Sequence, residues 1–133
     1  MSSIFTKIIN KELPSHTVWE NDKYIAFLSI KPVNPGHLLL VPKKEIGYIF
    51  DMNDEEYKEI FMLAKWLALP LQKATAAKKI GLSVEGFEIE HVHIHLIPIN
   101  NSGEMDPHRV REATDDELSA VAEKIKEEIK KLS

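Results

Sequence analysis

The chain contains no cysteine among its 133 residues. This absence excludes disulfide frameworks, thiol nucleophiles and zinc sites that depend on cysteine ligands. Basic residues are also in the minority, with 17 Lys and Arg against 21 Asp and Glu and a formal net charge of -4. Because nonspecific nucleic-acid binding relies on Lys and Arg to neutralise phosphates, we expect no nucleic-acid partner. A locally basic site could still bind a small anion.

Long apolar segments are missing as well. No run approaches the length of a membrane span, and residues 1–7 lack the apolar region of a signal peptide. The sequence therefore predicts no membrane partner and a cytoplasmic location. A chain of this length with 44% hydrophobic residues suits one compact domain over residues 1–133.

The order of the hydrophobic patterns predicts an α+β fold. Pro70 lies inside the pattern of a long helix and predicts a kink or break there, and Gly81 is expected to stop that helix. Hairpin-sized gaps favour one mainly antiparallel sheet with the helices on one face, which leaves the other face free for a ligand or partner. The predicted elements are a short helix at 4–10, strands near 18–19, 24–28 and 37–41, a long helix from 54 towards 79, strands at 82–84 and 89–98, and a helix at 115–131.

Residues 89–98 hold half of the six histidines of the chain, and these alternate with apolar residues. Because side chains alternate between the two faces of a strand, we expect His91, His93 and His95 to line one face. The apolar residues between and after them, Val92, Ile94 and Leu96, are expected to face the core. Three imidazoles in register are costly for a strand that only has to pack, so this face is the candidate functional site.

Four interpretations of the histidines compete: structural pairing, a metal site, a nucleophile for phosphorus, and nucleotide binding without turnover. A single metal ion is the weaker choice, because Cα atoms four residues apart in a strand are about 13 Å apart. No carboxylate shares the face either, since Glu88 and Glu90 have the opposite parity. We therefore expect no metal and no cofactor. A neutral imidazole can attack a phosphoryl centre and form a covalent intermediate, with its neighbours binding oxygens or handling protons.

The segment His91–Ile97 resembles the signature of the histidine triad (HIT) family, in which three histidines alternate with apolar residues. Three other segments agree with the family in order and spacing: residues 4–14, residues 26–37 with Pro35, Gly36 and His37, and residues 40–44. The resemblance covers about residues 3–99, and it points to a divergent bacterial-type branch. The terminal helix at 115–131 has no comparable match.

This resemblance implies a HIT-like five-stranded sheet that is extended across a homodimer. It implies an enzyme that hydrolyses or transfers a nucleotide at the α-phosphate of nucleoside phosphoramidates or dinucleoside polyphosphates, with a purine mononucleotide derivative as substrate. His93 resembles the nucleophile that forms a nucleotidyl-histidine, and His91 and His95 resemble its flanking partners. The alternative is a dimeric nucleotide-binding or regulatory protein with little turnover.

The resemblance also marks a nucleotide site and four departures from the family pattern. Ser29 stands where the family usually has an acidic residue for the ribose, and Glu45 stands where a fourth histidine often follows Pro-Lys-Lys. The loop before the histidines is shortened to residues 84–88, with Phe87 and Glu88 at positions usually held by Gln and Ser or Thr. His37, by contrast, is interpreted as structural. The residues matched to nucleotide contacts are Phe5, Ile8, Leu13, Phe27, Ser29, Ile30 and Glu88, of which the apolar ones could equally be core.

Overall fold

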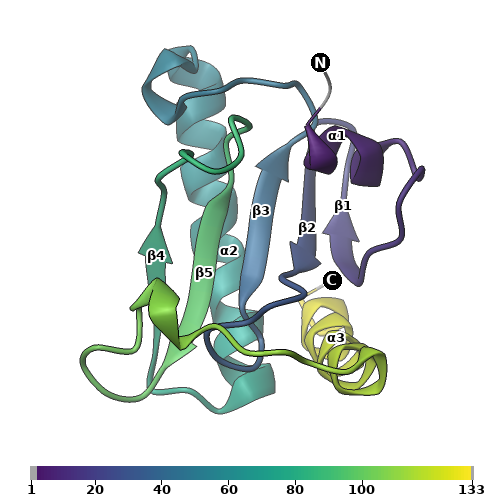
Figure 1. Ribbon diagram of the computed structural model, residues 1–133, viewed down its shortest axis with the longest axis vertical. Helices are drawn as coiled ribbons and strands as arrows, with labels where there is room; N and C mark the ends of the chain where they lie inside the picture. Colours follow the sequence, from purple (N-terminus) through teal and green to yellow (C-terminus); the bar gives the residue numbers. More distant parts are fainter. Residues whose placement is uncertain (1–2, 133) are drawn as a thin grey trace.

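The computed structural model describes residues 3–132. Within them, an antiparallel five-stranded sheet has the strand order β1-β2-β3-β5-β4, and helices pack on it (Figure 1). This architecture confirms the predicted α+β class. The elements are α1 (Ile4–Ile9), β1 (Thr17–Glu20), β2 (Tyr24–Leu28), β3 (Leu38–Pro42), the 3₁₀ turn η1 (Ile49–Asp51), α2 (Asp54–Thr75), β4 (Lys79–Ser83), β5 (Ile94–Ile99), the 3₁₀ turn η2 (Pro107–Arg109) and α3 (Asp115–Lys130).

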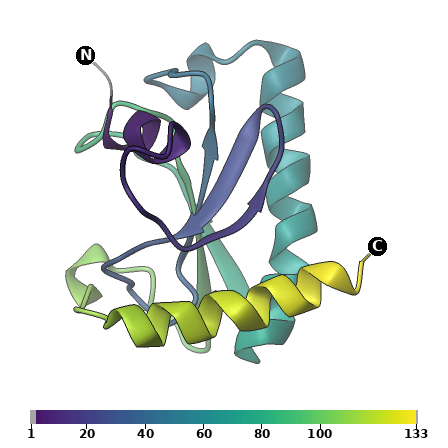
Figure 2. The same cartoon turned by 90° about the vertical axis from the view of Figure 1, so that its right-hand side faces the viewer.

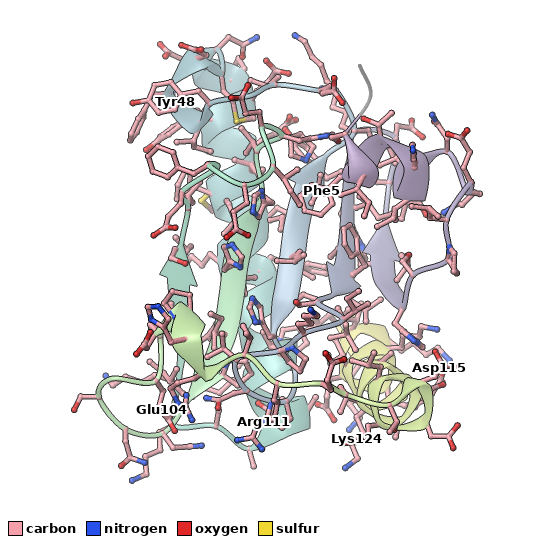
Figure 3. All side chains as sticks on the ribbon, viewed as in Figure 1. Phe5, Tyr48, Glu104, Arg111, Asp115 and Lys124 are labelled. Carbon is pink, nitrogen blue, oxygen red and sulfur yellow. The ribbon has the colours of Figure 1, made fainter. Side chains whose placement is uncertain are left out.

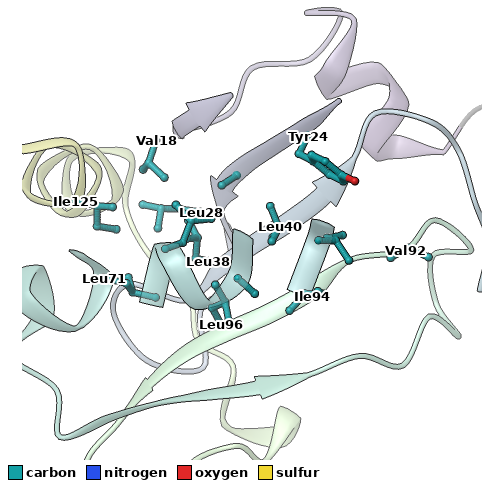
Figure 4. Packing of buried hydrophobic residues seen from close by; sticks show 14 of the residues in the cluster. Val18, Tyr24, Leu28, Leu38, Leu40, Leu71, Val92, Ile94, Leu96 and Ile125 are labelled. Atoms are coloured by element: carbon teal, nitrogen blue, oxygen red, sulfur yellow. The ribbon is translucent and has the colours of Figure 1, made fainter. Parts of the chain in front are cut away.

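The main core lies between the sheet and the two long helices. Figure 2 shows α2 running along one face of the sheet and α3 crossing near its end. The strand residues that face α2 alternate with residues on the opposite face, as the pleat of a strand requires. Val92, Ile94 and Leu96 are each at most 2% exposed in this core, which confirms their predicted burial. Figure 4 shows them with other members of the cluster, including Leu38, Leu40, Leu71 and Ile125.

A second, smaller core lies on the other face of the sheet, under α1. Phe5 of α1 packs there against Ile25, Phe27, Leu39 and Val41 from β2 and β3. The prediction that the helices cover one face only was therefore wrong. A helix of six residues such as α1 is not stable alone. Its apolar side is therefore buried against the sheet, and α1 covers part of the face that carries the histidines.

The long helix α2 continues through Pro70 without a break and ends at Thr75. A proline removes one backbone N–H, but Leu67, Pro70 and Leu71 are all buried, and this packing holds the helix together across the missing bond. Ala76 ends the helix with a left-handed φ of 56°, whereas Gly81 lies within β4. Neither α2, at 22 residues, nor any other helix within residues 3–132 is long and apolar enough to cross a membrane.

The strand that carries the histidines is shorter than predicted, because β5 begins only at Ile94. The neighbouring strands set this limit: β3 pairs with β5 as far as Leu40 opposite Ile94, and β4 as far as Ser83 opposite His95. Further along β3, Pro42 has no N–H to donate to a ladder. His91 and His93 therefore lie in a connecting segment that is held by side-chain contacts and by the backbone hydrogen bond from the N–H of Val92 to the carbonyl of Ile46.

Gly36 is expected to be the glycine that is most sensitive to substitution. Its φ is +92°, and a Cβ there would lie 2.6 Å from Cγ2 of Thr75 and 3.1 Å from Cγ of Pro98. We expect Gly36→Ala to lower the free energy of unfolding by about 3 kcal/mol, measured by urea denaturation. Gly103→Ala is the matched control, because φ is +83° but nothing lies within 4 Å, so we expect a loss of only about 1 kcal/mol. Equal losses would show that the close approach at Gly36 is not important.

Candidate active site

His91 is completely buried, and both of its ring nitrogens are engaged. Its Nε2 lies 2.8 Å from the carbonyl oxygen of Pro42, and its Nδ1 lies 2.6 Å from the hydroxyl of Ser3. Since a carbonyl can only accept, Nε2 carries the proton and donates it to Pro42. In the neutral ring Nδ1 then accepts the hydroxyl hydrogen of Ser3. The two hydrogen bonds therefore fix the ring in one orientation and one tautomer.

His93 is oriented by the backbone two residues before it. Its Nδ1 lies 2.7 Å from the carbonyl oxygen of His91, so Nδ1 carries the proton in the neutral ring and Nε2 keeps its lone pair. This Nε2 has no hydrogen-bond partner among the described residues, yet no buried side-chain nitrogen or oxygen there lacks one. Nε2 of His93 is therefore accessible, and it is the basic nitrogen that the site presents.

His95 is held by a chain of hydrogen bonds that starts at the main chain. The backbone N–H of Val33 donates to Nδ1 of His37 at 3.0 Å, which leaves the proton of the neutral ring on Nε2. This Nε2 lies 2.9 Å from Nδ1 of His95 and donates to it. In turn, His95 must carry its own proton on Nε2, where it is available as a donor.

Burial favours the neutral form of His37, His93 and His95. Burial lowers the pKa of His37 to about 3 and that of His95 to about 4, and the neighbouring rings add to both shifts. Burial also lowers the pKa of His93, although the bond to the carbonyl of His91 and the charge of Glu88 oppose this shift. The rings of His93 and His95 have centroids 4.9 Å apart. The site thus places one lone pair beside one N–H donor.

Three of the apolar residues matched to nucleotide contacts lie together next to the histidines. Phe5 projects from α1 towards the sheet (Figure 3), with its ring centroid 4.9 Å from that of His93 and 5.6 Å from that of Phe27. Ile8 packs against the same cluster. These side chains form an apolar wall beside the accessible nitrogen of His93.

The other four matched residues lie around this wall. Leu13 lines a cavity of about 410 Å³ with Ile8, between the α1–β1 connection and α3. Ser29 lines a smaller cavity of about 110 Å³ with His37. Ile30 is 67% exposed just beyond β2, and Glu88 is exposed in the loop before the histidines. Glu88 is close enough for its charge to oppose the lowering of the His93 pKa.

Sequence reasoning missed two members of the site and left a third undecided. His37 was interpreted as structural, but it is bonded directly to His95. Its position after Pro35-Gly36 at the start of a buried strand could have placed it in register with the histidines. Ser3 gave no signal beyond that of a helix N-cap. Glu45 was noted as a departure from the family, and its contacts become visible only in the fold.

The described residues contain no group of three or more His, Asp or Glu side chains that is arranged to hold a metal ion. The hydrogen bonds give the reason: both nitrogens of His91 and His37, and Nδ1 of both His93 and His95, already have partners. The expectation that the protein needs no metal stays a prediction.

Comparison with known sequences and structures identifies related proteins. A sequence model of the HIT domain matches residues 10–102. The adenylylsulfatase HINT1 of Arabidopsis thaliana is 38% identical over 107 residues, which cover 71% of this chain and 69% of the relative. The adenosine 5'-monophosphoramidase HNT1 of Candida albicans is 32% identical over 142 residues, covering 98% and 93%. A crystal structure of a HIT-like protein from Bartonella henselae has a TM-score of 0.84 and 30% identity, and covers 96% of both chains.

The chain therefore belongs to the HIT family. This confirms the resemblance carried by the histidine segment, and the solved structures confirm the five-stranded antiparallel fold.

The buried neutral rings predict a loss of stability in mild acid. The pKa values of His37 and His95 are held below their ordinary value of 6.5, so the unfolded chain takes up protons first as the pH falls. The stability that these rings contribute is present above pH 6.5 and is lost towards pH 4, at up to about 1.4 kcal/mol per pH unit for each ring.

Urea denaturation between pH 7 and pH 5 measures this effect. We expect His37→Asn to make the decline shallower than in the wild type. His108→Gln is the control, because His108 is exposed, and it should keep the wild-type slope. Identical slopes for His37→Asn and the wild type would contradict the assignment of a buried neutral ring.

Proposed function

We propose that this protein is a nucleotide hydrolase or transferase that acts at an α-phosphorus through a nucleotidyl-histidine at His93. The observation that carries the proposal is the tautomer of His93. The carbonyl of His91 binds the protonated Nδ1 and leaves the lone pair of Nε2 accessible. A nucleophile needs a free electron pair of fixed direction, and this ring supplies one without a separate base.

In the first step, Nε2 of His93 attacks the α-phosphorus, and the bond from phosphorus to the leaving group breaks with its electron pair. A leaving nitrogen takes up a proton from solvent and departs as the amine. The nucleotidyl-imidazole is positively charged, and the carbonyl of His91 at Nδ1 stabilises that charge. Nε2–H of His95 donates to a phosphoryl oxygen. In the second step, water attacks the phosphorus and loses a proton to solvent, the phosphorus–nitrogen bond breaks with its electron pair returning to Nε2, and a nucleoside monophosphate leaves with His93 neutral again.

The proposed substrates are nucleoside phosphoramidates and related α-phosphate derivatives, with a purine nucleoside. One relative is named an adenylylsulfatase and another an adenosine 5'-monophosphoramidase, and both names describe cleavage next to an adenylyl group. The apolar wall of Phe5, Ile8 and Phe27 offers a surface for a base beside His93. Dinucleoside polyphosphates present the same α-phosphorus and belong to the same class.

A second candidate function is nucleotide binding with little or no turnover. The exposed carboxylate of Glu88 acts on His93, and a negative charge there repels a phosphate that approaches the nucleophile. Ser29 also offers a ribose only a neutral hydroxyl, which makes weaker hydrogen bonds than a carboxylate. Turnover measurements separate this candidate from the enzyme.

His93→Ala is expected to abolish turnover while leaving the fold intact. Chelator-treated wild-type protein should release AMP from adenosine phosphoramidate, adenylyl sulfate or diadenosine polyphosphates, and His93→Ala should lower the rate by at least about 1000-fold. A quench in alkaline denaturant, which preserves a phosphorus–nitrogen bond, should trap a nucleotidyl adduct on the wild type that mass spectrometry detects.

His108→Ala is the matched control, because it removes an exposed histidine far from the rings in sequence, and its rate should equal that of the wild type. Binding of all these compounds without AMP release would support the second candidate. Activity that returns only with added Zn²⁺ would contradict the metal-free mechanism.

We also propose that the protein is a homodimer whose sheet continues from one protomer to its partner across β4. This strand lies at the edge of the sheet, and no other element covers its outer side in Figure 1. Its Leu82 is 44% exposed. An uncovered edge with an exposed leucine is suited to pairing with a second copy.

Leu82→Arg tests this arrangement by placing a charge on the β4 edge. Sedimentation velocity should show a dimer for the wild type and a dissociation constant at least about tenfold higher for Leu82→Arg. Val110→Arg is the control, since Val110 is similarly exposed at 46% but lies outside the sheet. Equal effects of the two substitutions, or a monomeric wild type, would contradict a β4 interface.

A further inference from the structure

A hydrogen-bond network of Ser3, Thr6 and Glu45 joins the first turn of α1 to His91. Oε1 of Glu45 accepts the backbone N–H of Ser3 at 2.7 Å and the hydroxyl of Thr6 at 2.8 Å. The hydroxyl of Ser3 lies 2.6 Å from Nδ1 of His91. Residues far apart in the sequence therefore meet at one face of a buried ring.

The hydroxyl of Ser3 makes two hydrogen bonds at the same time, one as acceptor and one as donor. Its oxygen accepts the backbone N–H of Thr6 at 3.1 Å, which caps α1. Its hydrogen is then free to be donated to Nδ1 of His91, which must accept because Nε2 donates to Pro42. One side chain thus ends the helix and fixes the ring.

The peptide unit that follows His91 connects the two rings. Its carbonyl is the acceptor for Nδ1 of His93, and its N–H, that of Val92, donates to the carbonyl of Ile46 at 2.7 Å. The ring of His91, fixed between Ser3 and Pro42, is a second anchor of this carbonyl beside that backbone bond. Phe5, on the same turn of α1, lies against the rings of both His91 and His93.

We propose that Ser3 and Glu45 are positioning residues: Ser3 fixes the ring of His91, and through its carbonyl the ring of His93, while Glu45 holds the first turn of α1 in place. Only the kinetic part of this inference depends on the proposed function. Glu45 suits the task because a carboxylate accepts both donors of the turn strongly. The N–H of Ser3 and the hydroxyl of Thr6 hold its pKa below the ordinary range, so it stays charged near neutral pH.

A simpler alternative is that these residues only cap a surface helix. Two controls reproduce that role elsewhere in the chain. Thr114 caps α3 by accepting the N–H of Glu117, and it contacts no histidine. Glu104 accepts backbone N–H bonds from Asn100 and Asn101, as Glu45 does from Ser3. Thr114→Ala and Glu104→Ala therefore remove comparable bonds without touching the site.

The first test needs no substrate. In ¹⁵N NMR spectra of the histidine rings, Ser3→Ala should move the unprotonated Nδ1 of His91 downfield more than any other ring nitrogen, because it loses its donor. Ser3→Thr should restore the wild-type position, and Thr114→Ala should leave it unchanged. An unchanged Nδ1 of His91 in Ser3→Ala would overturn the proposal.

The second test separates positioning from binding with adenosine phosphoramidate as substrate. Ser3→Ala should lower kcat by about 10- to 100-fold with KM within about twofold, since a misplaced nucleophile reacts slowly. Ser3→Thr should recover most of kcat. Glu45→Ala should raise KM several-fold, because the turn that carries Phe5 loosens, and should lower kcat less than His93→Ala does. Glu45→Gln, which keeps an acceptor oxygen, should lie in between.

Kinetics for Ser3→Ala and Glu45→Ala equal to those of Thr114→Ala and Glu104→Ala would overturn the proposal and leave only helix capping. The NMR result stands independently of turnover. If the wild type releases no AMP from any substrate while the Ser3→Ala shift occurs, the proposed enzymatic function is contradicted. The assignment of Ser3 as the residue that fixes the ring of His91 is then still supported.

Discussion

The hydrogen bond from Nδ1 of His93 to the carbonyl of His91 is the interaction on which the site depends. It links neighbouring residues of one short segment, and at 2.7 Å it fixes both the tautomer and the direction of the ring. Burial alone would leave a neutral imidazole free to place its proton on either nitrogen. With this bond, the accessible nitrogen is always the basic one. Two sets of contacts hold this carbonyl: Ser3 and Pro42 at the ring of His91, and the backbone hydrogen bond from the N–H of Val92 to the carbonyl of Ile46.

The two sides of the site are supported by different parts of the fold. His95 belongs to β5 and is directed by His37, which precedes β3, so the sheet itself sets the donor of the site. His91 and His93 lie before β5 and are directed by α1 and the end of β3. The small helix thus completes a face that the strands alone leave open. This division explains why α1 is packed on the sheet rather than beside α2 and α3.

The sequence predicted the parts that follow from periodicity. The alternation of His91, His93 and His95 with Val92, Ile94 and Leu96 correctly placed the three apolar residues in the core, and the fold class followed from the order of the elements. The start of β5 could not be predicted, because it depends on where neighbouring strands stop pairing. Pro70 misled for a related reason, since packing outweighed a local preference.

The partners of the histidines were harder to predict than the histidines themselves. Ser3 and Glu45 are 88 and 46 residues from His91 along the chain, and no spacing rule connects them. His37 carried a usable signal, since a histidine at the start of a strand buried on both faces has to find a partner. Substituted family positions such as Glu45 mark where to look, but only the fold shows what the new side chain contacts.

The chain of bonds through His37 begins at the backbone N–H of Val33, and this origin has a consequence for how the protein can vary. Two rings take their direction from a main-chain group, which every residue except proline possesses. The side chain at position 33 therefore does not affect the direction in which these hydrogen bonds donate, although it matters for packing. A comparison of related sequences would reveal this determinant only as a position where proline never occurs, although it fixes which nitrogen of His95 carries the proton.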